Sequence, residues 1–540
     1  MTGTFVLYDV IPAGTVAQND VYLLGTHDSV PPAIAPVNAT ADADAIVNNG
    51  TTSVDEIKVI DPVLVPPDPL PDKSLIWSNV IKTQSAATAV NGLAGADTII
   101  NTGTAASSAT DVILPGVVPT QLIGFKTSDV SSTAKATATG VDGGVDSDAI
   151  TNAGTLGADA SAAAAGASIQ VAEASEDAGK AVLKGKVTAG ATATGISGGD
   201  GNDIVTNRSA FEVTATSDTM AAGVAAVANS GKAASSAKSS SDARATGIDL
   251  GADSDTLVND NSVTATADST AQALNVTVDA RNPPEKPTGK IAPVSKLSKL
   301  KSTSDGGAEA NAHATGIGAD SPATETKGDP QINFTDTGIT LSYADSSVTL
   351  KPQSVTFQHQ PSYAGNDSIT NGADVTATAT ATVDAGSIGI GINGHASSKV
   401  DSKAASDAAA VDLGGGDDTL TNTGHLQATA DATANALDVT VLATTTSDPP
   451  EKFWGKVAAK LDDAGEYVLS KIHDTVDAGV SADSRAVGLS ADGMASDTGV
   501  KVTLSSQTDD NDATVVGLGV EVTKTHGGDG ADVVTNGAAI

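Results

Sequence analysis

The chain repeats a short core in which one Asp is followed four positions later by one Asn, with mostly aliphatic residues or Thr between them. The core occurs at Asp44–Asn48, Asp97–Asn101, Asp148–Asn152, Asp203–Asn207, Asp255–Asn259, Asp367–Asn371, Asp418–Asn422 and Asp532–Asn536. Subtracting successive Asp positions gives steps of 53, 51, 55, 52, 112, 51 and 114 residues, and the two long steps are close to double the others. A period near fifty residues, kept from end to end, predicts a repeat protein whose units stack on their neighbours.

Alternating small and polar residues follow most of these cores. In Val263–Ala267 and Val375–Ala381, Val and Ala occupy every second place and Thr fills the places between. A strict period of two predicts strands that place one set of residues on each face, and the β-branched Thr disfavours a helix. The expected fold class is therefore all-β: a parallel β-helix, or β-solenoid, lined by small residues.

The unit length sets the expected size of each coil. Each unit reads as strand, Gly/Asp corner, strand, Asn/Gly corner and strand. Because one coil of a parallel β-helix usually takes about 20 residues, the sequence predicts about two coils per unit, or one coil with an excursion. With coils about 4.8 Å apart, some twenty coils would form a rod about 100 Å long.

The composition changes after the first 35 residues, which gives the expected domain boundary. Residues 1–35 hold two aliphatic–aromatic runs, Phe5–Tyr8 and Val21–Leu24, separated by a Pro-Ala-Gly turn. They are predicted to form a short strand segment that either caps the first coil or joins another molecule. Residues 36–540 are predicted to form the β-solenoid, in units of about 53 residues.

Proline-rich insertions are expected near residues 61–80, 281–305 and 447–480. The last two begin with Pro-Pro-Glu-Lys, which ends a strand. The last contains five apolar residues at mostly helical spacing, Trp454, Val457, Leu461, Val468 and Ile472, whereas the preceding one contains Lys290, Lys296, Lys299 and Lys301. Two interpretations stay open: a solvated loop and a helix packed on its own body, or a contact between molecules.

The charge of the chain excludes several kinds of partner. Lys and Arg number 29 against 65 Asp and Glu, so the formal net charge is -36. Such a surface repels nucleic acid and anionic lipid and attracts divalent cations. No run of eighteen apolar residues is present, which predicts no membrane insertion. Cysteine is absent, so neither disulfides nor thiolate metal sites are expected.

Two corners suggest calcium binding. Gly198–Thr206 and Gly527–Thr535 both fit the pattern GGxGxDxUx, in which glycines let the chain bend and Asp supplies the hard oxygen ligands that Ca²⁺ prefers. The pattern resembles the calcium-binding RTX repeats, although that family repeats it in tandem and this chain does not. Candidate ligands are Asp146, Asp148, Asp200, Asn202, Asp203, Asp253, Asp255, Asp417, Asp418, Asp529 and Asp532. The alternative is that Asp and Gly simply build the turn while Asn caps the next corner.

The repeat as a whole resembles another group of bacterial proteins. Gly416–Gly424 reads GDDTLTNTG and is followed by alternating Ala strands. This style of repeat, over roughly residues 38–540, is similar to the β-helical passenger regions of autotransporters and other large secreted adhesins. The resemblance implies a secreted or surface-held β-solenoid in a bacterium.

Two enzyme patterns occur and are interpreted as chance. Gly195–Gly199 fits GxSxG and Gly389–Gly394 fits GxGxxG, yet the first lies in a repeat corner and the second continues a strand pattern. A β-helical enzyme acting on polysaccharide would need clustered carboxylates, basic residues and aromatic platforms, and aromatic residues make up only 2% of the chain. No catalytic residue is therefore predicted.

The functional expectation is an extracellular structural protein with no enzymatic activity. Its partners would be other copies of the chain, joined head to tail into a surface filament, sheath or matrix, with Ca²⁺ as a stabilising ion and surface polysaccharide as a further partner. The first alternative is a monomeric cell-surface adhesin. The second alternative is a carbohydrate-active β-helix enzyme.

Overall fold

The computed structural model of the 540-residue chain describes the parts that form its β-sheets. The described residues are 21–24, 37–38, 43–60, 76–114, 127–173, 179–229, 231–281, 301–320, 331–335, 338–343, 346–350, 355–359, 365–392, 395–443, 477–490, 496–508, 514–526 and 532–538. They contain strands and no helix. It follows that no described segment is a helix long and apolar enough to cross a membrane.

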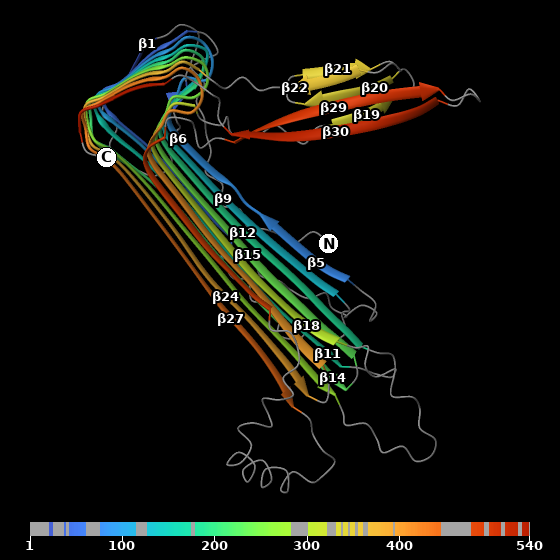
Figure 1. The fold of residues 1–540 in the computed structure, drawn as a ribbon. Coiled ribbons are helices and arrows are strands. Elements are labelled where there is room, and N and C mark those ends of the chain that lie inside the picture. Colours follow the sequence, from blue (N-terminus) through green and yellow to red (C-terminus); the bar gives the residue numbers. More distant parts are fainter. Residues whose placement is uncertain are drawn as a thin grey trace, which may run out of the picture.

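Three parallel sheets form the body, and all-β parallel stacking confirms the predicted fold class (Figure 1). The first, called the short sheet, contains nine strands. In order these are β1 (Val21–Leu24), β3 (Ala45–Asn48), β7 (Thr98–Asn101), β10 (Ala149–Asn152), β13 (Ile204–Asn207), β16 (Thr256–Asn259), β23 (Ser368–Asn371), β26 (Thr419–Asn422) and β31 (Val533–Asn536). From β3 onward, each strand begins directly after the Asp of one repeat core and ends at its Asn.

The two other sheets consist mostly of long strands. The outgoing sheet, which follows the Asn corner, contains β4 (Thr51–Ile60), β8 (Thr104–Ile113), β11 (Thr155–Glu173), β14 (Phe211–Asn229), β17 (Val263–Arg281), β24 (Val375–Ile392) and β27 (Leu426–Ala443). The returning sheet, which leads back to the Gly/Asp corner, contains β2 (Val37–Asn38), β6 (Ser85–Asn91), β9 (Thr127–Val145), β12 (Gly179–Asp200), β15 (Gly231–Asp249), β18 (Lys301–Gly318), β25 (His395–Asp412) and β28 (Asp477–Ser490), while β5 (Ile76–Lys82) also pairs with β9.

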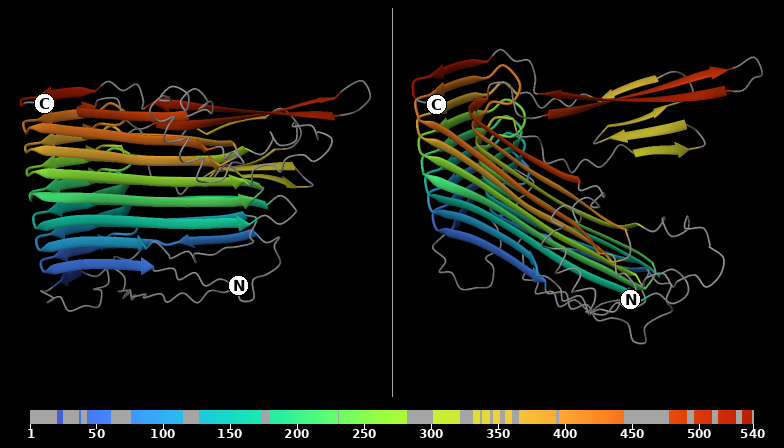
Figure 2. Two further views of the ribbon diagram at one scale, coloured as in Figure 1. Left: turned by 90° about the horizontal axis from the view of Figure 1, so that it is seen from below. Right: turned by 60° about the horizontal axis from the view of Figure 1, so that its bottom comes forward.

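One repeat makes one coil, which corrects both expected coil counts. The chain passes from β13 through the long strands β14 and β15 to β16, and β13 pairs directly with β16 so that Asn207 lies beside Asn259. The repeat is long because its outgoing and returning strands run for 19 residues each, so no second turn and no excursion is needed. Each coil is a long flattened loop (Figure 2).

The proportions of the body differ from the expected rod. A strand of 19 residues spans about 60 Å, whereas nine stacked strands rise only about 40 Å. The described body is therefore longer along its strands than along its stacking axis, and the prediction of a rod about 100 Å long with some twenty coils is wrong. We call the end of the long strands beside the short sheet the near end and the opposite end the far end.

The two long steps in the repeat are single coils with added segments. Asn259 lies beside Asn371 and Asn422 lies beside Asn536, so no coil is missing between them. At the near end, the first long step adds β19 (Gln331–Thr335), β20 (Gly338–Tyr343), β21 (Ser346–Leu350) and β22 (Val355–His359), and the second adds β29 (Ser496–Thr508) and β30 (Thr514–His526).

These added strands form two antiparallel sheets beside the body. Strand β22 pairs with β29 of the other added segment, and β29 pairs with β30. Strands β19, β20 and β21 form a separate meander. Together they project from the near end as an arm (Figure 1). The sequence analysis placed no insertion here.

Of its predicted N-terminal strands, Val21–Leu24 is confirmed as β1, and Phe5–Tyr8 lies outside the described residues.

The core changes in character along the coil. At the near end the three sheets meet, and ladders of fully buried aliphatic residues fill the space between them, such as Ile150, Val205 and Leu257 in the short sheet. Farther along, only the two long sheets face each other, and the inward residues are mostly Ala, as at Ala265 and Ala267. Small side chains let two sheets approach closely, so the predicted alanine-lined interior is confirmed.

Enlarging one inward alanine is expected to destabilise this layer. Ala265 is fully buried beside Val213 and Ala377 in the same sheet, so Ala265→Leu should cost about 1–3 kcal/mol of unfolding free energy by overpacking. Thr266→Leu, on the outward face of the same strand, is the matched control and should change stability by less than about 0.5 kcal/mol. Chemical denaturation measures both, and equal effects would contradict a close-packed interior at this level.

Candidate functional site

Stacked asparagines form a continuous ladder at one corner of the coil. The Nδ2 group of each core Asn donates a hydrogen bond to Oδ1 of the Asn in the next coil, at distances between 2.6 and 2.9 Å. The ladder runs through Asn48, Asn101, Asn152, Asn207, Asn259, Asn371, Asn422 and Asn536. An amide both donates and accepts, so identical side chains can satisfy one another inside the protein. The sequence analysis expected Asn only to cap backbone groups and missed this pairing.

Stacked aspartates form a second ladder at the other end of the short strands. The backbone N–H of each core Asp donates to Oδ1 of the Asp in the next coil, at 2.7 Å for the pair Asp203–Asp255 and 3.1 Å for Asp418–Asp532. The other carboxylate oxygen, Oδ2, is buried without a hydrogen-bond partner at Asp97, Asp148, Asp203, Asp255, Asp367 and Asp418. Glycine makes room for it: a Cβ added to Gly198 would lie 2.6 Å from Oδ2 of Asp203.

Burial makes these carboxyl groups weak acids. Removal from water, opposed by the backbone hydrogen bond and reinforced mainly by nearby carboxylates, raises the pKa of Asp203 and Asp418 to about 6, that of Asp148 and Asp367 to about 7 and that of Asp255 to about 9. Both desolvation and like charges disfavour the ionised form. Near neutral pH, Asp255 therefore keeps its proton, Asp148 and Asp367 are partly protonated, and Asp203 and Asp418 are largely ionised.

A third column, more exposed, lies one residue before the Asp ladder. Asn202 N–H donates to Oγ of Ser147 at 3.0 Å, and Oδ1 of Asn202 accepts from Ser254 N–H at 3.0 Å. The column continues through Asn366 to Asp417, whose N–H donates to Oδ1 of Asn366 at 2.8 Å. Side chains here join each corner to its neighbour.

In five of the Gly/Asp corners, two residues adopt left-handed backbone angles. In the corner that fits the calcium pattern these are Gly199, with φ of 106°, and Gly201, with φ of 127°. Asp146 and Asp253 take the position of Gly201 in their own corners, with φ of 77° and 75°. Glycine adopts this conformation without steric cost, and Asp tolerates it better than most residues. The turn itself therefore accounts for the Gly–x–Gly spacing.

The predicted calcium ligands fall into three groups. Asp148, Asp203, Asp255, Asp418 and Asp532 belong to the Asp ladder; Asp146, Asp200, Asn202, Asp253 and Asp417 are exposed at the corners; Asp529 lies outside the described residues. Within the described part of the chain, no three His, Asp or Glu side chains converge as a metal site would require. Calcium binding at these corners stays a prediction.

Comparison with known proteins finds nothing similar: no protein family, no curated protein and no solved structure matches the chain. The class that the fold and the corners define is a parallel β-solenoid repeat protein, with one coil per repeat and polar ladders at both ends of the short strands.

Breaking the Asn ladder in its middle is expected to lower stability. In Asn207→Ala, Nδ2 of Asn152 and Oδ1 of Asn259 would lose their partners inside the protein. Each buried polar group left unpaired costs about 1–3 kcal/mol, so the unfolding free energy should fall by about 2–4 kcal/mol. Arg208→Ala, at the neighbouring exposed position, should have little effect. Urea denaturation compares the two variants, and a matching loss in both would argue against the ladder.

Stability is expected to fall as pH rises. Folding raises the pKa of Asp255 from 3.8 to about 9, so between these values the folded protein holds more protons than the unfolded chain. The stabilisation is complete below the unfolded pKa and is lost as pH rises through the folded pKa. Denaturation at about pH 5.5 and about pH 8.5 should show the greater unfolding free energy at the lower pH. In Asp255→Asn, which keeps an oxygen acceptor for Asp203 N–H, the difference should shrink; greater stability at the higher pH would contradict the assignment.

Proposed function

We propose that this protein is an extracellular structural β-solenoid whose copies join head to tail into a filament, sheath or matrix. The observation that carries the proposal is that no other described strand covers the last coil of the described body. Among described strands, β27 pairs with β24 along one edge only. The inward alanines of β27, from Ala428 to Ala436, are partly exposed. In the short sheet, Val534 of β31 is 38% exposed, although Leu420, its partner on the adjacent strand β26, is fully buried.

The first coil differs from the last, which favours joining of unlike ends. Strand β1 pairs with β3, so the first repeat strand of the short sheet already has a neighbour. In β4, Thr52 and Val54 are buried, and Glu56 Oε2 accepts a hydrogen bond from Ala86 N–H at 2.9 Å. A contact between two different surfaces that does not close on itself produces a linear assembly.

Several features support a location outside the cell. The repeat resembles bacterial β-solenoid passenger regions, and the chain is strongly acidic, with a formal net charge of -36. Bound Ca²⁺ would screen the acidic corners, and surface polysaccharide is the further partner that this location suggests. No step of this role needs a catalytic residue, so we propose a non-enzymatic protein.

A monomeric adhesin is the second candidate, and the projecting arm favours it. Two segments that are far apart in the sequence, around β22 and β29, pair with each other outside the body. An arm displayed at one end of a stiff scaffold is a common arrangement for binding. This candidate predicts monomers that bind a cell surface, whereas the leading proposal predicts assembly of purified protein.

Blocking the edge of β27 tests the assembly. Ala430 faces inward and Thr429 faces outward on this strand. An inward lysine should prevent another strand from stacking, so Ala430→Lys should abolish filaments while Thr429→Lys, of equal charge, should keep them. Negative-stain microscopy and light scattering, each with calcium and with chelator, measure the outcome. Monomers from the unmodified chain under both conditions would overturn the proposal.

A further inference from the structure

Basic side chains of the described body gather on one face of the molecule. Eleven Lys and Arg side chains are described, and nine of them are exposed on the outward face of the returning sheet. The other two are Lys58 and Arg208. On β12 and β15 the basic residues alternate with buried ones such as Val187 and Ala243, so they point outward. We call the nine the basic band: Lys82, Lys135, Lys184, Lys186, Lys238, Arg244, Lys399, Lys403 and Arg485.

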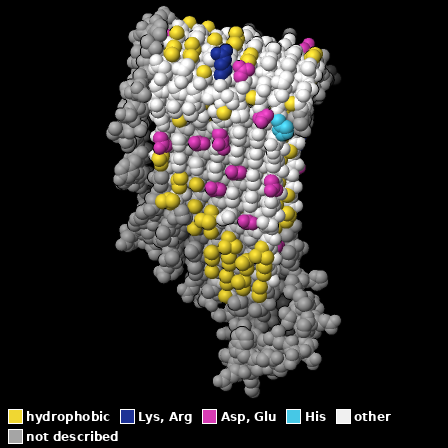
Figure 3. Space-filling view, turned by 90° about the vertical axis from the view of Figure 1, so that its left-hand side faces the viewer, with side chains coloured by type: hydrophobic (Ala, Val, Ile, Leu, Met, Phe, Trp, Pro, Cys, Tyr) yellow, Lys and Arg dark blue, Asp and Glu magenta, His cyan; other side chains and the backbone are white. Residues whose placement is uncertain are grey.

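The outward face of the outgoing sheet carries the opposite charge. The described side chains on this face include seven carboxylates and no Lys or Arg. Figure 3 shows acidic side chains scattered over this face, with hydrophobic ones gathered below them. We call the seven the acidic band: Asp55, Asp159, Glu212, Asp218, Asp268, Asp384 and Asp431. Because the two long sheets face each other across the interior, the two bands lie on opposite sides of the body.

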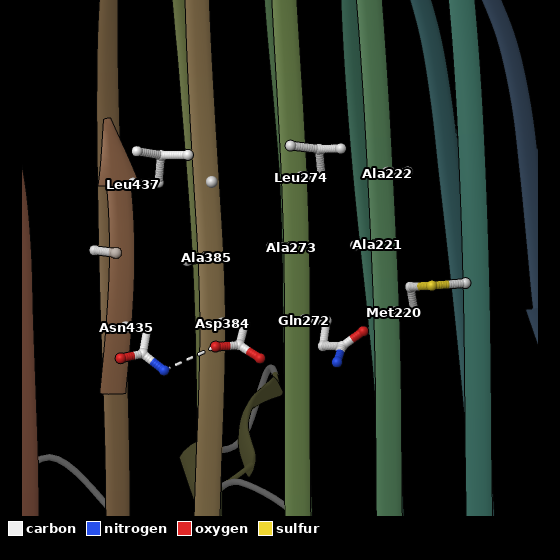
Figure 4. Close-up of a pocket in the computed structure, with 12 residues that line it drawn as sticks. Met220, Ala221, Ala222, Gln272, Ala273, Leu274, Asp384, Ala385, Asn435 and Leu437 are labelled. Atoms are coloured by element: carbon white, nitrogen blue, oxygen red, sulfur yellow. Dashed lines mark hydrogen bonds between the residues drawn. The ribbon is translucent and has the colours of Figure 1, made fainter. Parts of the chain in front are cut away.

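Toward the far end the same face of the outgoing sheet becomes apolar. Its residues line up in rows across β14, β17, β24 and β27: Ala222–Leu274–Gly386–Leu437, Val224–Val276–Ile388–Val439 and Ala226–Val278–Ile390–Val441. A groove of about 560 Å³ marks the border with the acidic band (Figure 4). On its side toward the near end, Nδ2 of Asn435 donates to Oδ1 of Asp384 at 2.9 Å. The apolar rows cover only about 400 Å², half of what a stable interface needs from each partner.

Only part of the basic band is neutralised on its own face. Nζ of Lys238 lies 3.6 Å from Oδ2 of Asp305, and Nε of Arg244 lies 3.0 Å from Oδ1 of Asp242. On the strands of the earlier coils, β5, β9 and β12, four lysines form no ion pair with a described side chain: Lys82, Lys135, Lys184 and Lys186. The positive charge that a partner could meet is therefore concentrated on these three strands.

We propose that the basic band of one copy of the chain packs against the acidic band of a second copy, so that copies stack face to face. Each copy presents both bands, one on each side. A contact between two different surfaces that does not close on itself adds copies in a row. This row runs across the sheets, whereas the proposed joining of ends runs along the stack of coils. The inference goes beyond the proposed function and does not depend on it.

The two bands match in position along the strands. Both are measured here from the far turn, where β14 ends at residue 229 and β15 begins at residue 231. The row of Lys184 lies five positions from this turn and Arg244 thirteen, whereas the row of Asp384 lies nine positions from it and Glu212 seventeen. Each band is thus eight residues long, about 27 Å, and a shift of about 13 Å between copies aligns them.

The bands also match in spacing and area. Each is built on straight parallel strands (Figure 2), which lie about 4.8 Å apart and present an outward side chain about every 6.8 Å. Charges on one face can therefore align with charges on the other when the strands of the two copies run side by side. The seven strands of the outgoing sheet are about 29 Å across, so the acidic band covers about 800 Å². A stable interface needs about this area from each partner.

The net charge of the chain does not prevent this contact. The formal charge of -36 makes copies repel each other at a distance. At about 0.1 M salt, however, charges interact over only about 10 Å. At contact the facing side chains therefore decide the interaction, and here they have opposite signs.

Reversing one charge tests the contact. Lys186→Glu should weaken self-association at least about tenfold, because the new carboxylate would face the acidic band of the next copy. Arg208→Glu changes the net charge equally at an exposed position outside both bands, and this matched control should change association less than about twofold. Sedimentation velocity measures both at about 0.1 M salt. In the unmodified chain, association should weaken at about 1 M salt, where charges interact over only about 3 Å.

Mixing two variants tests which faces meet. One variant combines Lys184→Glu with Lys186→Glu, and the other combines Asp218→Lys with Asp268→Lys. Each alone would set like charges against each other and should stay monomeric. An equal mixture should associate again, because the unchanged basic band of the second variant meets the unchanged acidic band of the first. The same measurements in the Ala430→Lys chain separate this contact from the joining of ends, because face-to-face association should persist there.

Four results would overturn the inference. The first is an Ala430→Lys chain that stays monomeric at both salt concentrations. The second is an equal loss of association in Lys186→Glu and Arg208→Glu, and the third is a mixture that associates no better than its separate components. The fourth is binding of an anionic polysaccharide, probed with dextran sulfate, to the basic band of a chain that does not associate with itself.

Discussion

Side-chain hydrogen bonding between identical residues of successive coils holds this fold in register. Asn207 can satisfy Asn152 and Asn259 at once only if every coil places an Asn at the same height and angle. A shift of one residue in any short strand would turn the amide outward and expose the buried aliphatic residue two places before it. The Asn ladder therefore fixes the position of each short strand, and the long strands of the coil start from there.

The Asp ladder also holds successive coils in register, but it places buried acidic groups close to one another. Its backbone-to-carboxylate bonds close the Gly/Asp corner, yet they stack acidic groups above one another in a buried column, with Asp255 the most strongly affected. Protonation relieves the repulsion, which links the stability of the corner to pH. The left-handed positions beside the ladder, such as Gly199 and Gly201, let the chain turn tightly enough to bury these carboxyl groups.

Two surfaces of the described body are not covered by other described residues, and both bear on function. The last coil shows a long strand edge and partly exposed alanines at β27, and the outward face of the outgoing sheet shows apolar rows at its far end. The first surface supports assembly between copies, because a strand edge pairs readily with another strand. The second is too small for that purpose. One strand, β27, borders both surfaces.

Sequence alone determined the local features: strands from the period of two, corners from Asp, Asn and Gly, small residues facing inward, and Val21–Leu24 as a strand. Each depends on residues a few positions apart. Tertiary structure alone decided that one repeat is one coil and that the long steps contain paired added strands. It also decided that the side chain of Asn207 forms hydrogen bonds with the Asn side chains of the two neighbouring coils. The length of β14, for example, is set by the sheet packed against it and by the neighbouring strands. Contacts between residues some fifty positions apart have no signature in a local pattern.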